Sequence, residues 1–293
     1  MGTRSARREE CSRRGLAAAV AVAGEHGLRV GEPVVLNDLF SLMVHLAPAP
    51  VVARVATWAP VMRRPAEDWL RREVDVTGWL AGQGAPVVAP SAELPAGPHE
   101  RDGFAISFWT HLRADPDRTV GTADCAAMLA DLHAALRGYP GELPLLAPAA
   151  NEIPRGLAAL DADPGPLTPA EADRLRAAAD RLRPFWQAPP GELQPLHGDA
   201  HPGNIVATAD GFVWIDFEDV CTGPVEWDLA LLHQQDPDAV AAHHRPVPET
   251  MARCSELRAL HVALCLITYR DTLGDTDGWD AGIRYFVGAL PHP

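Results

Sequence analysis

Residues 196–220 read "LHGDAHPGNIVATADGFVWIDFEDV", and this stretch decides the fold that the sequence predicts. Asp199 and Asn204 lie five residues apart with a Pro-Gly pair between them, so they belong to a tight loop and not to a helix. The segments "IV" and "FVWI" flank the turn "ADG", which is typical of a β-hairpin whose second strand ends at Asp216. We expect this hairpin to bring Asp216 back beside Asn204.

These three side chains have the chemistry of a phosphoryl-transfer site. The amide oxygen of Asn204 and the carboxylate of Asp216 are hard ligands, and so sparse a pair suits Mg²⁺, which takes its other ligands from water and from substrate phosphates. Asp199 remains available to orient an attacking hydroxyl and accept its proton. The pattern therefore predicts kinase-like transfer, in which positioning supplies most of the rate.

The ordered pattern "HGDAHPGN…WIDFE", followed by "GPVEWDLALL", resembles the aminoglycoside phosphotransferase and choline kinase family, whose fold is similar to that of eukaryotic protein kinases. The resemblance implies an α+β, bilobal protein. Residues 1–108 would form a small nucleotide-binding lobe with an antiparallel sheet, and residues 109–293 a larger, mostly helical lobe for catalysis and substrate binding. It also implies transfer of the γ-phosphate of ATP or GTP, with Mg²⁺ and Asp199, to a hydroxyl of a small molecule, with an antibiotic as the leading acceptor.

The resemblance further implies a set of nucleotide-binding residues. Arg54 in "PVVARVA" stands where the family has a cation on the third strand, and because the chain contains no lysine, only arginine can fill this place. Glu73 in "LRREVDVTGWL" stands where a helix glutamate pairs with that cation. The stretch "SFWTHL" resembles the hinge between the lobes, so backbone groups near Trp109 and His111 would contact the purine. The usual glycine-rich phosphate loop is missing, and "LNDLFSLMV" stands in its place.

The acceptor site is less determined by the sequence. Family members use C-terminal helices for it, and here "YRDTLGDTDGWD" offers Tyr269, Asp271 and Trp279. A housekeeping metabolite is an alternative to an antibiotic. The net charge of −14 is compatible with a cationic substrate steered by an acidic cleft, although solubility alone explains such a charge equally well.

Two other classes of function fit parts of the sequence. In "HGDAH", His197 and His201 together with Asp216 resemble a hydrolase metal site, but that hypothesis does not explain Asn204 or Arg54. A catalytically inactive pseudokinase would keep the fold without the chemistry, yet the three site residues around the hairpin are all present. We therefore favour the kinase.

Composition limits the partners and the compartment. A net charge of −14 argues against nucleic acid, whose phosphates require a basic surface. No apolar run reaches the ~18–20 residues that a membrane-spanning helix needs. The five cysteines are scattered, odd in number and never in a CxxC pair, which predicts neither a zinc site nor a disulfide framework. We expect a cytoplasmic protein with no nucleic-acid or membrane partner.

Hydrophobic periodicity predicts the main elements. Strands are expected in "PVVLND", "LMVHLAP", "PVVARVA" and "FAISFWTHL", and the Pro-rich residues 139–170 are poorly periodic. The predicted helices cover residues 5–26, "PAEDWLRREVDVTGWLAGQG", "TADCAAMLADLHAALRG", 169–183, 226–233, 248–273 and 279–290.

Overall fold

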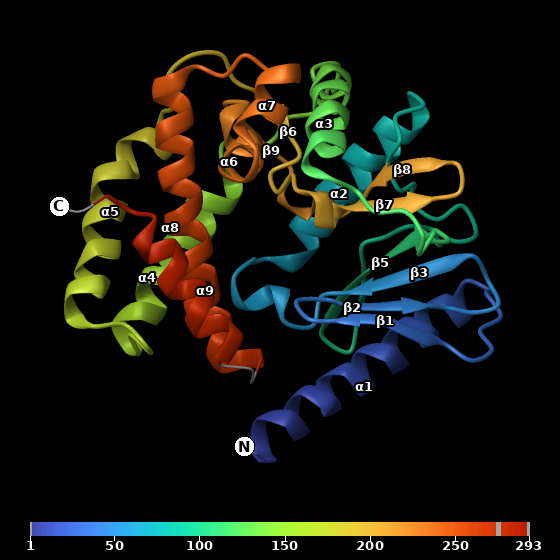
Figure 1. Ribbon diagram of the computed structural model, residues 1–293. Helices are drawn as coiled ribbons and strands as arrows, with labels where there is room; N and C mark the ends of the chain where they lie inside the picture. Colours follow the sequence, from blue (N-terminus) through green and yellow to red (C-terminus); the bar gives the residue numbers. More distant parts are fainter. Residues whose placement is uncertain (1, 274–276, 292–293) are drawn as a thin grey trace. The chain divides into compact units, whose positions relative to one another are not determined.

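The computed structural model describes the backbone of residues 2–273 and 277–291, and the side chains of residues 6–270 and 278–291. The chain divides into two compact units (Figure 1). Unit 1 comprises Met1–Thr119 and Val206–Glu218, and unit 2 comprises Val120–Ile205 and Asp219–Pro293. An antiparallel sheet dominates unit 1 and helices dominate unit 2, which confirms the predicted α+β class with a small N-terminal sheet and a larger helical part.

The sheet of unit 1 has five antiparallel strands in the order β1-β2-β3-β5-β4. Their bounds are Val34–Asp38 (β1), Leu42–His45 (β2), Val51–Val55 (β3), His99–Arg101 (β4) and Phe104–Thr110 (β5). The four predicted strands are confirmed, and β4 is an additional short strand. The central strand β3 is buried along its whole length, so both of its faces are covered.

Alternation along β3 sends successive side chains to opposite faces. Val51, Ala53 and Val55 join a core cluster with the small apolar residues of helix α1 (Gly2–Glu25). Val52 belongs to a different apolar cluster, which indicates that it and Arg54 point to the other face. Helix α2 (Ala66–Gly82) supplies the partner that Arg54 meets there.

The predicted hairpin is present as β7 (Ile205–Thr208) and β8 (Gly211–Trp214). In unit 1, Trp214 is fully buried, and its backbone exchanges hydrogen bonds with Pro86 and Val88 just after α2. This contact fixes the end of β8, and therefore the segment that carries Asp216, against the rest of unit 1.

Unit 2 is mostly helical. It contains α3 (Thr122–Leu136), α4 (Ala147–Ala162), α5 (Pro169–Gln187), α6 (Glu226–Gln235), α7 (Pro237–His243), α8 (Pro248–Leu273) and α9 (Asp277–Gly288). The long helix α8 packs against α4, α5, α6 and α9. Two short strands, β6 (Gln194–Leu196) and β9 (Cys221–Gly223), pair antiparallel with each other. In the sequence, β6 comes just before the loop that carries Asp199, and β9 follows the hairpin. None of the described helices combines the length and hydropathy that a membrane span requires.

Helix α4 was not predicted from the Pro-rich stretch in which it lies. Pro148 occupies the first turn, where a helix does not need the missing N–H. Pro154 lies inside the helix and is tolerated because the apolar stripe around it, including Ile153 and Leu160, is buried. Tertiary packing has outweighed the low intrinsic helix propensity of proline.

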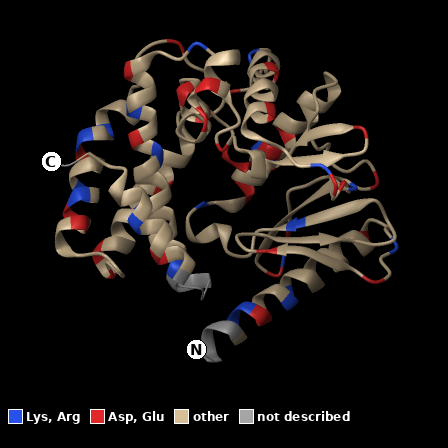
Figure 2. Ribbon diagram, viewed as in Figure 1, with Lys and Arg blue, Asp and Glu red and all other residues tan. Residues whose placement is uncertain are grey.

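Basic residues on helices α1 and α5 are accompanied by acids (Figure 2). On α5, Arg176 pairs with Asp161 and Asp173, and Arg183 pairs with Asp180. On α1, Arg13 pairs with Glu10. These exposed pairs contribute little to stability, but they neutralise the basic charge of these helices locally.

Candidate active site

The predicted residues of unit 1 meet in one charged cluster around Arg54. Its Nη1 donates to Glu73 Oε1 at 2.9 Å and to Asp216 Oδ1 at 2.8 Å, while Nη2 lies 2.5 Å from Glu218 Oε2. Arg63 donates to the other Glu218 oxygen at 2.7 Å. The planar fork of Arg54 thus holds three carboxylates at once, which a lysine ammonium cannot do in the same geometry.

Burial makes this cluster electrostatically demanding. Burial raises the pKa of Glu73; Arg54 opposes that shift, while Asp216 and Glu218 add to it. The raised pKa of Glu73, about 8, means that this carboxyl is largely protonated near neutral pH, so Asp216 and Glu218 balance the charges of Arg54 and Arg63. Asp216, 38% exposed against 2% for Glu73, is the carboxylate most open to a further cation.

Asp216 is also strained. Its φ of 66° lies in the left-handed region, which a non-glycine residue adopts at a cost of about 1–3 kcal/mol. Glu73 helps to hold this conformation, because its carboxylate accepts a hydrogen bond from the backbone of Phe217. The fold therefore holds the Asp216 side chain in a chosen direction, as is common for residues of functional sites.

Of the two predicted hinge residues, Trp109 lies on the same face of the sheet as Arg54, and His111 follows the end of β5. Trp109 is buried in an apolar cluster with Val52 and Val88, against which Ile215 also packs. The His111 N–H donates to Pro50 O at 2.9 Å and is therefore already engaged. The cluster makes this face of the sheet apolar beside Arg54.

The loop that carries Asp199 is held in place by hydrogen bonds to Asp228 of α6. Asp228 accepts hydrogen bonds from the backbone N–H of His197 at 2.9 Å and of Gly198 at 2.8 Å, and it also pairs with His133. Burial would raise the Asp228 pKa, but the hydrogen bond and charge of His133 and the nearby His197 lower it below its usual value. A buried, ionised acid thus fixes the loop.

Gly198 is required by this geometry. Its φ of 89° is left-handed, and a Cβ at this position would overlap the carbonyl oxygen of Asp219. Its own carbonyl accepts from Trp227 Nε1 at 2.8 Å and from Arg258 Nη1 at 3.1 Å. The backbone immediately before Asp199 is therefore immobilised on both its donor and its acceptor side.

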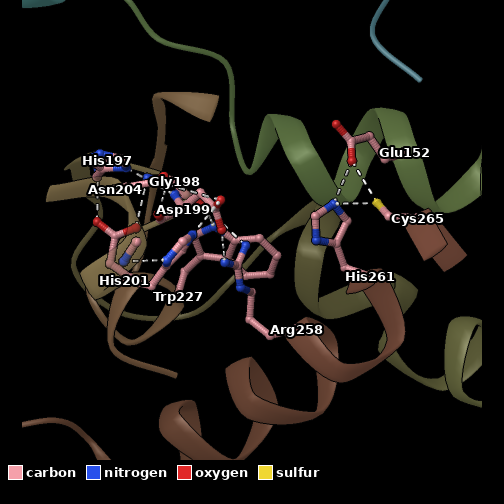
Figure 3. A network of polar contacts seen from close by, with 12 residues as sticks. Glu152, His197, Gly198, Asp199, His201, Asn204, Trp227, Arg258, His261 and Cys265 are labelled. Atoms are coloured by element: carbon pink, nitrogen blue, oxygen red, sulfur yellow. Dashed lines mark hydrogen bonds and ion pairs between the residues drawn. The ribbon is translucent and has the colours of Figure 1, made fainter. Parts of the chain in front are cut away.

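The Asp199 carboxylate is held by three side chains of unit 2 (Figure 3). Arg258 of α8 forms an ion pair with Oδ1. Asn204 Nδ2 donates to Oδ2 at 3.3 Å and to the Asp199 carbonyl at 2.9 Å, and His201 Nε2 lies 3.5 Å from Oδ2. With 34% of its side chain exposed, Asp199 still has lone pairs open to a substrate hydroxyl.

These contacts determine the charge of Asp199. Burial would raise its pKa, but the charge of Arg258 and the contacts with His201 lower it well below its usual value. Asp199 is therefore ionised near neutral pH and only weakly basic, which favours orientation of a hydroxyl over early proton abstraction.

Asn204 presents a suitable oxygen for a cation. Its side-chain hydrogen bonds within the described chain are all donated by Nδ2, so the amide oxygen is left for another ligand. An amide oxygen and a carboxylate are donors that fit Mg²⁺. The residues present in each unit are thus chemically suited to the ion that the sequence predicts.

The three residues suggested for the acceptor have different positions in unit 2. Tyr269 is buried in α8 with 3% exposed, whereas Trp279 of α9 is half-buried. The Asp271 side chain lies outside the described residues. The role of Tyr269 and Trp279 in acceptor binding stays a prediction.

Several residues of these clusters were not predicted from the sequence, among them Arg63, Arg258 and Glu218. Arg258 lies 59 positions after Asp199 in an unremarkable helical stretch, and no local signal reveals it. Glu218 lies two residues after Asp216 in "DFED", and no local pattern distinguishes it from an ordinary loop acid. Its contacts with Arg54 and Arg63 show that it is part of the charge cluster.

Comparison with known proteins places the chain in a family. The family model described as "Phosphotransferase enzyme family" matches residues 52–245 of the 293, more than half of the chain. The chain belongs to this family. The match spans Arg54, Glu73, Asp199, Asn204 and Asp216, and it confirms the resemblance seen in the sequence. The sequence has no significant match among curated proteins.

Solved structures share the fold at low sequence identity. The choline kinase LicA from Streptococcus pneumoniae is 14% identical, with 92% of this chain and 98% of that chain covered and a TM-score of 0.63. For an amicoumacin kinase, hAmiN, the identity is 12%, the coverage 92% and 91%, and the TM-score 0.60. For aminoglycoside 2'-phosphotransferase-IIIa these values are 14%, 94% and 97%, and 0.60.

Proposed function

We propose that this phosphotransferase family member is a Mg²⁺-dependent small-molecule O-kinase. It would transfer the γ-phosphoryl group of ATP or GTP to a hydroxyl of its acceptor. The observation that carries the proposal is the fixed, ionised and partly exposed carboxylate of Asp199, held by Arg258 and Asn204. A carboxylate in that state can accept a hydrogen bond from a hydroxyl and so direct the hydroxyl oxygen toward the phosphate.

In the reaction, Asp199 accepts a hydrogen bond from the acceptor hydroxyl and aims its oxygen at the γ-phosphorus. The new P–O bond forms as the bond to the β,γ-bridging oxygen breaks, and the hydroxyl proton leaves through Asp199. Bound Mg²⁺ supplies charge neutralisation for the phosphates. Asn204 and Asp216 are the residues that would hold it.

Unit 1 supplies the nucleotide-binding groups in this proposal. Arg54, kept in place by Glu73, would donate to a phosphate oxygen of the nucleotide in place of Asp216, which would be one of the residues that hold Mg²⁺. The apolar cluster around Trp109 would take the base. The amicoumacin kinase structure contains AMP-PNP and Ca²⁺, and the aminoglycoside phosphotransferase structure contains GDP, which supports testing both ATP and GTP here.

The acceptor we propose is a hydroxylated small molecule, with an antibiotic first and an amino alcohol second. The neighbours named for their substrates include kinases for choline, amicoumacin and aminoglycosides, so both classes belong in the test. None of the five cysteines is in a disulfide, which agrees with action in a reducing cytoplasm.

The test is transfer of radiolabelled γ-phosphate from ATP and GTP to a panel of aminoglycosides, macrolides, nucleoside antibiotics and amino alcohols. We expect one chemical class to become labelled only when Mg²⁺ is present. An Asp216→Ala variant should lose Mg²⁺-dependent nucleotide binding. If no nucleotide bound to the wild-type protein with Mg²⁺, the kinase proposal would be wrong and a pseudokinase would be favoured.

A further inference from the structure

A second polar cluster lies in unit 2, outside the proposed catalytic residues (Figure 3). Glu152 of α4 meets His261 and Cys265 of α8. Glu152 Oε2 lies 2.8 Å from His261 Nε2 and 2.9 Å from Cys265 Sγ, and Sγ lies 3.4 Å from Nε2. Within the described residues, this is the group of His, Cys, Asp and Glu side chains whose ligand atoms are mutually close enough to hold one metal ion.

The two helices build this cluster on rigid backbone. His261 and Cys265 are four residues apart, so both side chains lie on the same face of α8. Gly156, one turn after Glu152, permits the approach of α4, because a Cβ there would overlap Leu264. The carboxylate from one helix and the two donors from the other are therefore held together by close helix packing.

The geometry does not fit a nucleophilic triad. In such a triad the acid and the nucleophile contact different nitrogens of the histidine. Here Glu152 and Cys265 both address Nε2 of His261. Three potential ligand atoms instead converge on a common point, which is the arrangement of a metal site.

We propose that Glu152, His261 and Cys265 bind a zinc-type transition-metal ion. One carboxylate, one imidazole and one thiolate form a donor set suited to Zn²⁺ or Co²⁺, whereas Mg²⁺ prefers oxygen alone. At zinc–ligand distances of about 2.0–2.3 Å, tetrahedral ligand atoms lie roughly 3.3–3.6 Å apart. The Sγ–Nε2 edge already has that length, and a small rotation of Glu152 opens the other two edges.

The charges and exposure of the cluster agree with this site. The carboxylate and the thiolate cancel the two charges of the metal, and the imidazole is neutral, so the complex carries no net charge. Binding would therefore neutralise the Glu152 carboxylate, which is only 1% exposed and costly to bury as an ion. Three protein ligands leave one position for water or another ligand. Cys265 is only half-buried, so the cluster is not sealed from solvent.

His261 also sets a limit on affinity. Its Nδ1 is buried and has no hydrogen-bond partner in the described part of the chain. Zinc-binding histidines usually donate this N–H to an acceptor, and loss of that contact weakens binding about 10–100-fold. We therefore expect metal binding weaker than that of a closed structural zinc site.

The proposed metal site lies close to Arg258, the arginine that pairs with Asp199. Arg258 and His261 are three residues apart on α8, and both contact the ring of Trp227, at 4.6 and 5.7 Å to its centroid. A metal that links α4 to α8 would therefore fix the helix segment that holds Arg258. The proposal rests on the cluster alone and stands whether or not the chain transfers phosphate.

The test is a titration of metal-free, reduced full-length protein with Co²⁺ in the presence of excess Mg²⁺, followed by absorption. We expect one equivalent of Co²⁺ to produce a thiolate-to-cobalt charge-transfer band and the strong visible bands of tetrahedral Co²⁺, both reversed by Zn²⁺. The bands should disappear in Cys265→Ser and persist in Cys11→Ser, which removes the thiol of another incompletely buried cysteine, on α1.

A second variant protects the test against misfolding. Glu152→Gln keeps the size of the side chain but replaces the carboxylate with a poor zinc ligand, so the bands should again be lost. Zn²⁺ should raise the melting temperature of the wild-type protein and of Cys11→Ser, but not of Glu152→Gln. Absence of a thiolate band in the wild-type protein, or its persistence in Cys265→Ser, would overturn the proposal and leave a hydrogen-bonded cluster.

Discussion

Replacement of Arg258 tests how the fold orients Asp199. Arg258 is 1% exposed, and its guanidinium pairs with Asp199, donates to the Gly198 carbonyl and lies over the Trp227 ring. Arg258→Met keeps most of the aliphatic volume but removes all three contacts. We expect the variant to fold and bind nucleotide, because the proposed nucleotide-binding residues belong to unit 1, but to turn over slowly.

The magnitudes follow from those contacts. A charge-assisted hydrogen bond contributes about 1.5–3 kcal/mol and a neutral one about 1 kcal/mol. Loss of these contacts is partly offset, because the variant no longer has to desolvate a buried arginine and because water still reaches Asp199. We expect the free energy of unfolding to fall by about 2–3 kcal/mol and kcat to fall about 100-fold through misorientation of Asp199.

The assay is steady-state phosphate transfer with urea unfolding and nucleotide titration run in parallel. Arg253→Met is the matched control, because Arg253 lies exposed on the same helix, and it should leave all three measurements unchanged. Arg258→Lys should recover only part of the loss, since a point charge cannot hold the Asp199 carboxylate and the Gly198 carbonyl in the same fork. A kcat within twofold of wild type for folded Arg258→Met would refute the positioning role.

Three other predictions concern single contacts. Arg54→Lys should raise the KM for nucleotide about tenfold and lower stability by about 1–3 kcal/mol, because lysine cannot hold Glu73, Asp216 and Glu218 together; an unchanged KM in kinetic assays would contradict this. Gly198→Ala should lower the free energy of unfolding by more than about 2 kcal/mol, since φ at this position is left-handed and the alanine Cβ would overlap Asp219. An unchanged urea midpoint in the variant would contradict this prediction. The pKa of Asp228 is lowered in the native protein, so this carboxylate binds a proton more readily in the unfolded protein. Its stabilisation is therefore present above its ordinary pKa of about 4 and is lost as the pH falls through the native value. Urea midpoints measured from pH 6 to about pH 3 should thus depend less on pH in Asp228→Asn than in the wild type, and equal slopes would contradict the assignment.

The local sequence predicted those parts of the structure that local patterns determine. The hairpin after Asn204, the strand around Arg54 and the helix containing Glu73 each have a clear periodicity and turn residues, and each is present. The pairing of Arg54 with Glu73 required knowledge of a related family, because nothing within either segment specifies the other.

Features that depend on distant packing were not predicted. Helix α4 is hidden by its prolines and becomes stable through contact with α8. Arg258 acts on a residue 59 positions away, and the cluster of Glu152 with Cys265 joins residues 113 positions apart. The scattered cysteines gave no zinc pattern in the sequence, because the ligand set we propose is assembled by two helices and not by a CxxC motif.

The central claim is that Asp199 directs phosphate transfer. The most direct measurement is transfer of γ-labelled phosphate by Asp199→Ala beside the wild-type protein, with Mg²⁺-nucleotide affinity measured for both. We predict that the variant binds Mg²⁺-nucleotide with an affinity close to that of the wild type but forms no labelled product, since the group that orients the hydroxyl is lost. Near-normal turnover by Asp199→Ala would contradict the account.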